Sequence, residues 1–323
     1  MIDLKPLPLF RPKLVFTKPI LSRLPERKYV TIAAGFPCKT GLVICADTQE
    51  TIAGYVKTDT EKIKLFQAAD KKYNVVFTGA GNGDLIDTAI NEMTEALSAE
   101  KPEGLVRIAI LLKKTMLKLF QDCIQPYASF PNDDRPSVTM LIGVQSPRST
   151  ALYKAAGTSF SPLHEAECIG YGIALGKSLI KQLFKPEMTI DEAALAALYV
   201  LHEAKRWVDG CGGNSDILLL THDGQILRMG TEWIISLERH FDEFNQHLTP
   251  LRIACADRHK EHDDFDKILS EFDYHIQRLR GRFVAELFTT DRQQQELFLK
   301  GYVPRTNRKR IRLPVSRKSA DKQ

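Results

Sequence analysis

The chain has 323 residues, of which 43% are hydrophobic and 26% are charged. This composition is typical of a globular protein that buries one large core or two smaller ones, and it excludes collagen, a disulfide miniprotein and disorder throughout the chain. Residues 301–323 carry about +7, so the other 300 residues sum to about −2. The net charge of +5 therefore comes from the C-terminal tail.

Targeting and cofactor signals are weak throughout the sequence. No stretch approaches the roughly 18 consecutive apolar residues of a membrane span, and prolines and basic residues interrupt the N-terminus. We therefore expect a cytoplasmic protein without a membrane partner. The six cysteines occur singly, His259 and His262 lack the HExxH spacing, and no nucleotide-binding motif is present. We expect no metal site and no cofactor.

The chain begins with a proline-rich, basic segment at 1–28 that has no sustained hydrophobic period, which predicts an extended leader. β-Branched runs then predict a buried hairpin at 29–35 and 41–47. Two more strands are predicted, at 62–66 and 74–79. Apolar residues then recur with helical spacing in two segments, at about 85–97 and 104–120. We expect these two helices to be antiparallel.

The same alternation then repeats. It predicts strands at 137–145 and 150–155, helices at 170–184 and 189–208, and two further strands at 216–220 and 225–229. Thr189 and Glu192 form an S/T-x-x-E capping box at the start of the second of these helices.

This order predicts two sheets, each covered by a pair of helices. A four-layer αββα sandwich, an α/β fold, would bury every apolar face, so we assign it to residues 29–230. Residues 231–300 are charged and helical in pattern, with the strongest segment at 264–288, and predict a helical extension. Residues 301–323 form a basic tail.

Five motifs between about residues 30 and 230 resemble, in order, those of a bacterial proteasome-like β-type subunit of the N-terminal-nucleophile hydrolase superfamily. The motifs are an opening hairpin, a lysine at a strand start, a glycine turn into the first helix, a second glycine turn into the third helix, and a segment that resembles the family's Asp-x-x-Ser-Gly-Gly. They are TIAAGFPCKTGLVICADTQETIAGYV (31–56), KI (62–63), FTGAGNGDL (77–85), IGYGIALG (169–176) and VDGCGG (208–213). The resemblance implies the sandwich fold of that superfamily.

The resemblance also implies a threonine-type peptidase or amidase. Thr31, which lies 16 residues before Asp47 as in the family, would be the nucleophile once the leader is removed. Its α-amino group would then act as the base, because such amines have a pKa of about 7.7–8.0. Asp47 and Lys62 would form a charged pair in which the ammonium favours the ionised hydroxyl and the carboxylate holds the ammonium in place.

The same resemblance implies two supporting roles and a set of partners. The backbone N–H of Gly81 would stabilise the oxyanion, and Asp209, with Cys211, would support the terminal amine. The substrate would be a peptide or protein, and the chain would assemble into a homo-oligomeric ring. Any ATPase would be a separate protein.

Two alternatives stay open at this point. The chain could be a non-catalytic structural subunit with an uncleaved leader, because Val30 stands where self-processing members usually have glycine, and in another register Val30 itself replaces the nucleophile. Tyr171 and Cys211 also replace two serines of the family motifs. The basic run at 305–318 could instead bind nucleic acid or another acidic partner.

Overall fold

A computed structural model describes residues 31–52, 56–70, 72–129, 135–147, 149–257 and 259–289. The predicted leader at 1–28 and the basic tail at 301–323 lie outside the described residues. The chain divides into two compact units, Met1–Gly224 and Gln225–Gln323. The sequence analysis placed the boundary after residue 230, a few residues beyond this division after Gly224.

One sheet of the first unit has the strand order β10-β1-β2-β11. The strands are β1 (Ile32–Cys38), β2 (Gly41–Asp47), β10 (Glu167–Gly170) and β11 (Ser215–Thr221). All neighbours are antiparallel, and the predicted first hairpin is confirmed by the register that places Ala34 opposite Cys45. Every residue of β2 is buried, as expected for a strand covered on both faces.

The other sheet has the order β5-β6-β7-β8-β9 and is antiparallel throughout. Its strands are β5 (Lys64–Gln67), β6 (Asn74–Gly81), β7 (Val138–Ser146), β8 (Ser149–Ala156) and β9 (Ser159–Leu163). A separate two-stranded hairpin, β3 (Gln49–Ile52) and β4 (Val56–Asp59), precedes it in the chain. The sequence patterns did not predict β3, β4, β9 or β10, which are all only four or five residues long.

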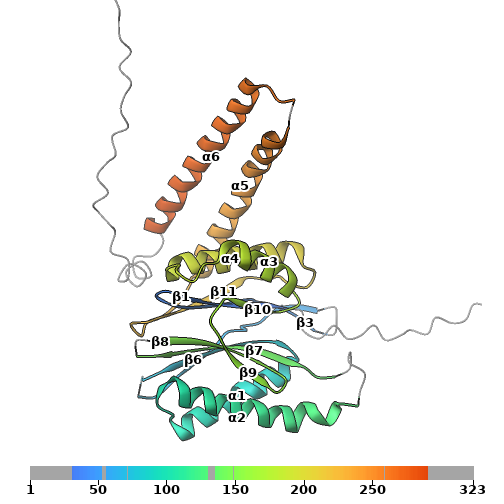
Figure 1. The fold of residues 1–323 in the computed structure, drawn as a ribbon, viewed down its shortest axis with the longest axis vertical. Helices are drawn as coiled ribbons and strands as arrows, with labels where there is room; N and C mark the ends of the chain where they lie inside the picture. The colour runs from blue at the N-terminus through green and yellow to red at the C-terminus, as the bar shows by residue number, and fades with distance from the viewer. Residues whose placement is uncertain are drawn as a thin grey trace, which may run out of the picture. The chain divides into compact units, whose positions relative to one another are not determined.

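Helices cover the two outer faces of the stacked sheets (Figure 1). Helices α1 (Gly83–Glu100) and α2 (Gly104–Leu119) lie against the second sheet, and α3 (Ile173–Leu183) and α4 (Ile190–Trp207) lie against the first. A π-helical turn (Phe120–Ile124) and a 3₁₀ turn (Gln125–Tyr127) follow α2. The predicted four-layer αββα sandwich is therefore confirmed.

Local sequence signals explain where these helices begin. The capping box of α4 is present: the Thr189 side chain accepts a hydrogen bond from the Glu192 N–H, and the Glu192 carboxylate accepts one from the Thr189 N–H. At α1, the Asn82 side chain accepts a hydrogen bond from the Leu85 N–H. The glycine turn after β6 therefore leads directly into a capped helix.

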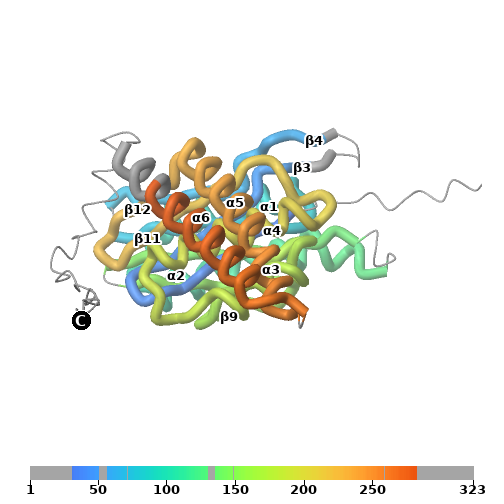
Figure 2. The backbone as a smooth tube through the Cα atoms, turned by 90° about the horizontal axis from the view of Figure 1, so that it is seen from above, coloured from blue at the N-terminus to red at the C-terminus, as the bar shows by residue number. Residues whose placement is uncertain are grey.

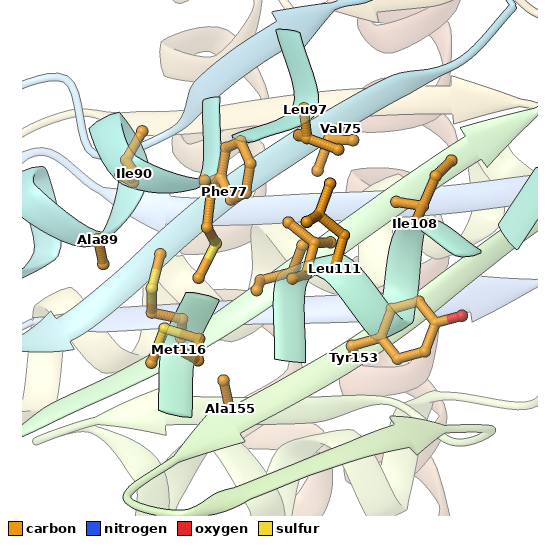
Figure 3. Close-up of a cluster of buried hydrophobic side chains, with 14 of the residues drawn as sticks. Val75, Phe77, Ala89, Ile90, Leu97, Ile108, Leu111, Met116, Tyr153 and Ala155 are labelled. Carbon is orange, nitrogen blue, oxygen red and sulfur yellow. The ribbon is translucent and has the colours of Figure 1, made fainter. Parts of the chain in front are cut away.

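The core beneath α1 and α2 is a cluster of buried apolar side chains (Figure 3). Val75 and Phe77 point from β6 toward the helices, where Leu97 of α1 and Ile108 of α2 meet them. These helical positions belong to the 3.6-residue period of the sequence, and they are all fully buried.

The two sheets contact each other through reciprocal glycine–leucine pairs. Gly35 of β1 faces Leu152 of β8, and a Cβ atom at Gly35 would lie 2.8 Å from the leucine methyl carbons. Gly143 of β7 faces Leu42 of β2, where the corresponding distance would be 2.7 Å. Each sheet therefore admits a leucine from the other at a position where a side chain would not fit.

The second unit consists of β12 (Ile226–Arg228) and two long helices, α5 (Thr231–Ala256) and α6 (His262–Thr289). The helices lie side by side (Figure 2) and pack through aromatic rings, with the centroids of Phe244 and Phe272 6.3 Å apart. The helix predicted at 264–288 corresponds to α6. No helix in the described part of the chain has the length and apolar character needed to cross a membrane.

Candidate active site

Three side chains predicted from the sequence motifs converge at one edge of the sheets. Thr31 directly precedes β1, Asp47 is the last residue of β2, and Lys62 lies just before β5. The Thr31 hydroxyl donates a hydrogen bond to Asp47 Oδ1 at 2.6 Å. The Lys62 Nζ donates to Thr31 Oγ1 at 2.7 Å and to Asp47 Oδ1 at 2.8 Å. Each of the three side chains therefore contacts the other two.

Asp47 is fully buried, and its carboxylate is compensated by several donors. Besides the threonine and the lysine, Oδ1 accepts a hydrogen bond from the Ile32 N–H at 3.2 Å, and Oδ2 accepts one from the Gly212 N–H at 3.0 Å. A buried charge is costly unless it is paired and hydrogen-bonded, so this carboxylate depends on its neighbours.

The Lys62 ammonium is largely buried, with 13% of its side chain exposed. Its third hydrogen bond goes to the Gln49 carbonyl, so its three donors all have acceptors. The sequence pattern placed Lys62 in a strand, but the strand begins only at Lys64. The lysine therefore lies in the connection before β5.

The backbone of Thr31 is held by the turn after β10. The Thr31 carbonyl accepts a hydrogen bond from the Tyr171 N–H at 2.7 Å. Gly170 has φ +97°, and a Cβ atom there would lie 2.1 Å from that carbonyl oxygen. Only glycine combines this backbone angle with such close approach, so the IGYG motif positions the nucleophile candidate.

Cys211 and Tyr171, which replace serines of the family motifs, have different environments. Tyr171 is exposed, with a relative accessibility of 59%. Cys211 is buried, and burial, assisted by the Asp47 charge, raises the pKa of its thiol to about 12, although Lys62 acts in the opposite direction. The thiol therefore stays protonated near neutral pH and does not compete with the Thr31 hydroxyl as a nucleophile.

Gly81 is the last residue of β6, and its requirement for glycine has a packing cause. Its φ is +120°, and a Cβ atom there would lie 2.1 Å from the Ser137 carbonyl oxygen. The preceding residues Gly79 and Ala80 line the cavity beside Thr31. The oxyanion role of Gly81 stays a prediction, and the packing against Ser137 is sufficient to explain the glycine.

Asp209 lies in the exposed turn after α4. The residue of the VDGCGG segment that contacts the charged cluster is Gly212, through its N–H to Asp47. This segment thus reaches the charged cluster through Gly212, and the supporting role of Asp209 stays a prediction. The backbone roles of Gly212, Gln49 and Tyr171 were not predicted, because side-chain chemistry does not reveal backbone donors and acceptors. Tyr171 was noted only as the replacement of a serine.

A cavity of about 120 Å³ opens beside these groups and is lined partly by Thr31, Lys62, Gly79 and Ala80. The hydroxyl of Thr31 thus lies next to a space that could hold part of a substrate. Among the described residues, no three histidine, cysteine or acidic side chains are grouped to bind a metal ion. The arrangement is chemically suited to an activated hydroxyl, because an ammonium beside the oxygen stabilises a developing negative charge.

Comparison with known proteins supports the fold. The chain matches no family model. The described fold is similar to that of Anbu (ancestral beta-subunit) from Yersinia bercovieri, with a TM-score of 0.58 and 16% identity over 68% of this chain and 97% of that one. It is also similar to Anbu in a helical assembly from Pseudomonas aeruginosa, with a TM-score of 0.57 and 15% identity over 68% of this chain and 96% of that one.

Curated relatives give the same result at the level of sequence. The proteasome subunit beta of Archaeoglobus profundus is 20% identical over 211 residues, which are 64% of this chain and 91% of the relative. That of Archaeoglobus fulgidus is 22% identical over 209 residues, 63% of this chain and 91% of the relative. The fold is that of the proteasome-like N-terminal-nucleophile hydrolases. In sequence the chain is similar to proteasome β subunits, and in fold it is similar to Anbu.

Proposed function

We propose that the protein is a threonine-type peptidase or amidase in which Thr31 is the nucleophile after removal of the preceding residues. The observation that carries this proposal is the position of Thr31 Oγ1, 2.7 Å from the Lys62 ammonium and 2.6 Å from the Asp47 carboxylate. A structural subunit has no evident need for a largely buried ammonium directed at a threonine hydroxyl. The relationship to proteasome β subunits supports the same reading.

The reaction follows from the chemistry of these groups. Cleavage of the Val30–Thr31 bond would free an α-amine on Thr31, and that amine would take the hydroxyl proton as Oγ attacks the substrate carbonyl carbon. The Lys62 ammonium would stabilise the charge that develops on Oγ, and Asp47 would hold the ammonium in position. Collapse of the tetrahedral intermediate would expel the amine product and leave an ester on Thr31, which water then hydrolyses.

Other parts of the proposal concern the setting of the reaction. The curated relatives are named as subunits, and Anbu from Pseudomonas aeruginosa is described in a helical assembly, so we propose that this chain also assembles with copies of itself. A homo-oligomeric ring is the closed form of such an assembly. The substrate would be a cytoplasmic peptide or protein, and an ATPase, where one takes part, would be a separate protein.

The first test is the N-terminus of the purified protein, measured by intact mass and N-terminal sequencing. A chain that begins at Thr31 and cleaves fluorogenic peptides would support the proposal. Thr31→Ala should abolish cleavage without changing the unfolding midpoint, and Thr31→Ser, which keeps a hydroxyl, should retain activity. A full-length chain without turnover, or equal turnover by Thr31→Ala, would reject the proposal, and the first of these results would favour a structural subunit.

A further inference from the structure

The cavity beside Thr31 has a size suited to one amino-acid side chain. Its volume of about 120 Å³ is close to that of an engineered cavity of about 150 Å³ that binds benzene, a molecule of side-chain size. Pockets for drug-sized ligands are several times larger. The cavity therefore fits a single side chain of a longer peptide that passes Thr31.

Its lining carries an excess of negative charge. The two cations in the lining are already paired, Lys62 with Asp47 at 2.8 Å and Lys64 with Glu61 at 3.3 Å. Three further carboxylates line the cavity, and in the described part of the chain none of them forms an ion pair; they belong to Glu50, Asp84 and Asp87. The occupant that balances this charge is a cation.

The rest of the lining is apolar or backbone. Ile86 and Ile90 of α1 reach the cavity together with Gly79 and Ala80 at the end of β6. Ile90 is buried, whereas Asp84 and Asp87, on the same helix, are exposed. Lysine and arginine side chains match this combination, because their aliphatic stems cover apolar surface while their charged ends remain near water and carboxylates.

We propose that this cavity receives a lysine or arginine side chain of the substrate, next to the bond that Thr31 would cleave. The inference rests on the proposed function for its biological meaning, but the binding preference can be measured without any cleavage. A substrate with an aspartate or glutamate at this position would be disfavoured, since it would bring a like charge to three unpaired carboxylates.

The test compares binding of two peptides to the full-length Thr31→Ala protein. The peptides differ only at one residue, which is arginine in one and citrulline, a neutral side chain of the same shape, in the other. We expect the arginine peptide to bind about fivefold more tightly at low salt, as two or three partly exposed charge pairs would give. The difference should shrink as salt screens these pairs.

Substitutions then locate the preference. In the Thr31→Ala background, Asp87→Asn should reduce the ratio of the two affinities, and the triple substitution Glu50→Gln, Asp84→Asn and Asp87→Asn should bring it close to one. Glu95→Gln is the matched control, because Glu95 is an exposed acid of the same helix outside the cavity lining. It should leave the ratio unchanged. Thermal unfolding of each variant identifies any loss of fold.

The outcomes separate this inference from the proposed function. Equal or absent binding of the two peptides, or a preference that survives the triple substitution, would overturn the inference. If the unsubstituted protein cleaves leucine peptides as fast as arginine peptides, hydrolysis stands and the basic preference fails. If arginine-selective binding occurs without any cleavage, the cavity assignment stands and the proposed hydrolysis fails.

Discussion

The Thr31 hydroxyl both donates and accepts within the charged cluster, donating to Asp47 and accepting from Lys62. In this arrangement the carboxylate fixes the ammonium, and the ammonium is the group placed to stabilise a negative oxygen on Thr31. Replacing the lysine therefore has two separable consequences, one for activity and one for stability.

Lys62→Met should lower peptide turnover by about two orders of magnitude or more, the usual cost of removing one preorganised electrostatic contact. It should also lower the free energy of unfolding by about 3 kcal/mol, because Asp47 stays buried without its cation. Lys72→Met is the control, since Lys72 forms exposed ion pairs with Asp70 and Glu103 away from the site. Steady-state kinetics and denaturant titration measure both effects, and equal behaviour of the two variants would contradict the assignment.

Gly170→Ala tests the turn that holds the Thr31 carbonyl. Gly224→Ala is the matched comparison, because the two glycines have similar φ values of +97° and +92° but only Gly170 faces a crowding atom. Gly224→Ala should cost about 1–2 kcal/mol for the left-handed conformation alone. Gly170→Ala should cost clearly more in a urea titration, and a cost equal to that of Gly224→Ala would show that the close approach does not matter.

At the scale of elements, α5 and α6 bring two histidines together. The rings of His247 and His275 stack with centroids 3.7 Å apart and 9° between their planes. Partial burial, together with the neighbouring His275, lowers the pKa of His247, against an opposite effect of Glu243. The neutral ring is therefore favoured in the folded helix pair, and protonation of His247 opposes the stacked arrangement.

The second unit should therefore lose stability as pH falls. A group whose pKa is lower in the folded than in the unfolded state binds more protons when unfolded, so acid favours unfolding below the unfolded value of about 6.5. NMR titration of the His247 ring should give a pKa below that value, and His275→Phe should move it upward. An unshifted His247 pKa would contradict this expectation.

The long elements were predictable from sequence because their apolar residues repeat with a clear period. Helices α1, α2 and α4 and strands β2 and β7 all correspond to predicted segments, and the capping box fixed the start of α4. The short strands β3, β4, β9 and β10 were not predicted. Short strands show few alternations and depend on partners distant in the sequence. For this reason β5, which also has four residues, was predicted with shifted bounds at 62–66, and the other four were not predicted.

The candidate site could likewise be predicted only in part. Thr31, Asp47 and Lys62 were identified through ordered motifs, and the structure brings them into mutual contact. The N–H donors of Gly212 and Tyr171 were missed as individual contacts, although both lie in the motifs quoted. Backbone groups occur at every residue, so only three-dimensional geometry shows which of them point into a site.

At the scale of the whole molecule, the net positive charge comes from the C-terminal tail at 301–323, which lies outside the described residues. Deleting residues 301–323 removes about +7 and leaves about −2. If the tail binds an acidic partner, the full chain should bind heparin or nucleic acid with an affinity that falls steeply with salt, and the truncated chain should not. Filter binding at two salt concentrations measures this, and salt-insensitive or absent binding by the full chain would reject the role. Peptide turnover by the truncated protein is the accompanying control.

The reciprocal pairs Gly35–Leu152 and Gly143–Leu42 have a consequence for the site. Thr31 and Asp47 belong to the edge of one sheet, whereas Lys62, Gly79 and Ala80 belong to the other sheet or to the connection leading into it. Each leucine packs against a glycine of the opposing sheet, where a Cβ atom would crowd the leucine methyl carbon, so these pairs favour one alignment of the two sheets. A misalignment of about one ångström is enough to impair a catalytic site. Packing at Gly35 and Gly143 in the middle of the sandwich thus helps to align the residues of the candidate site at its edge.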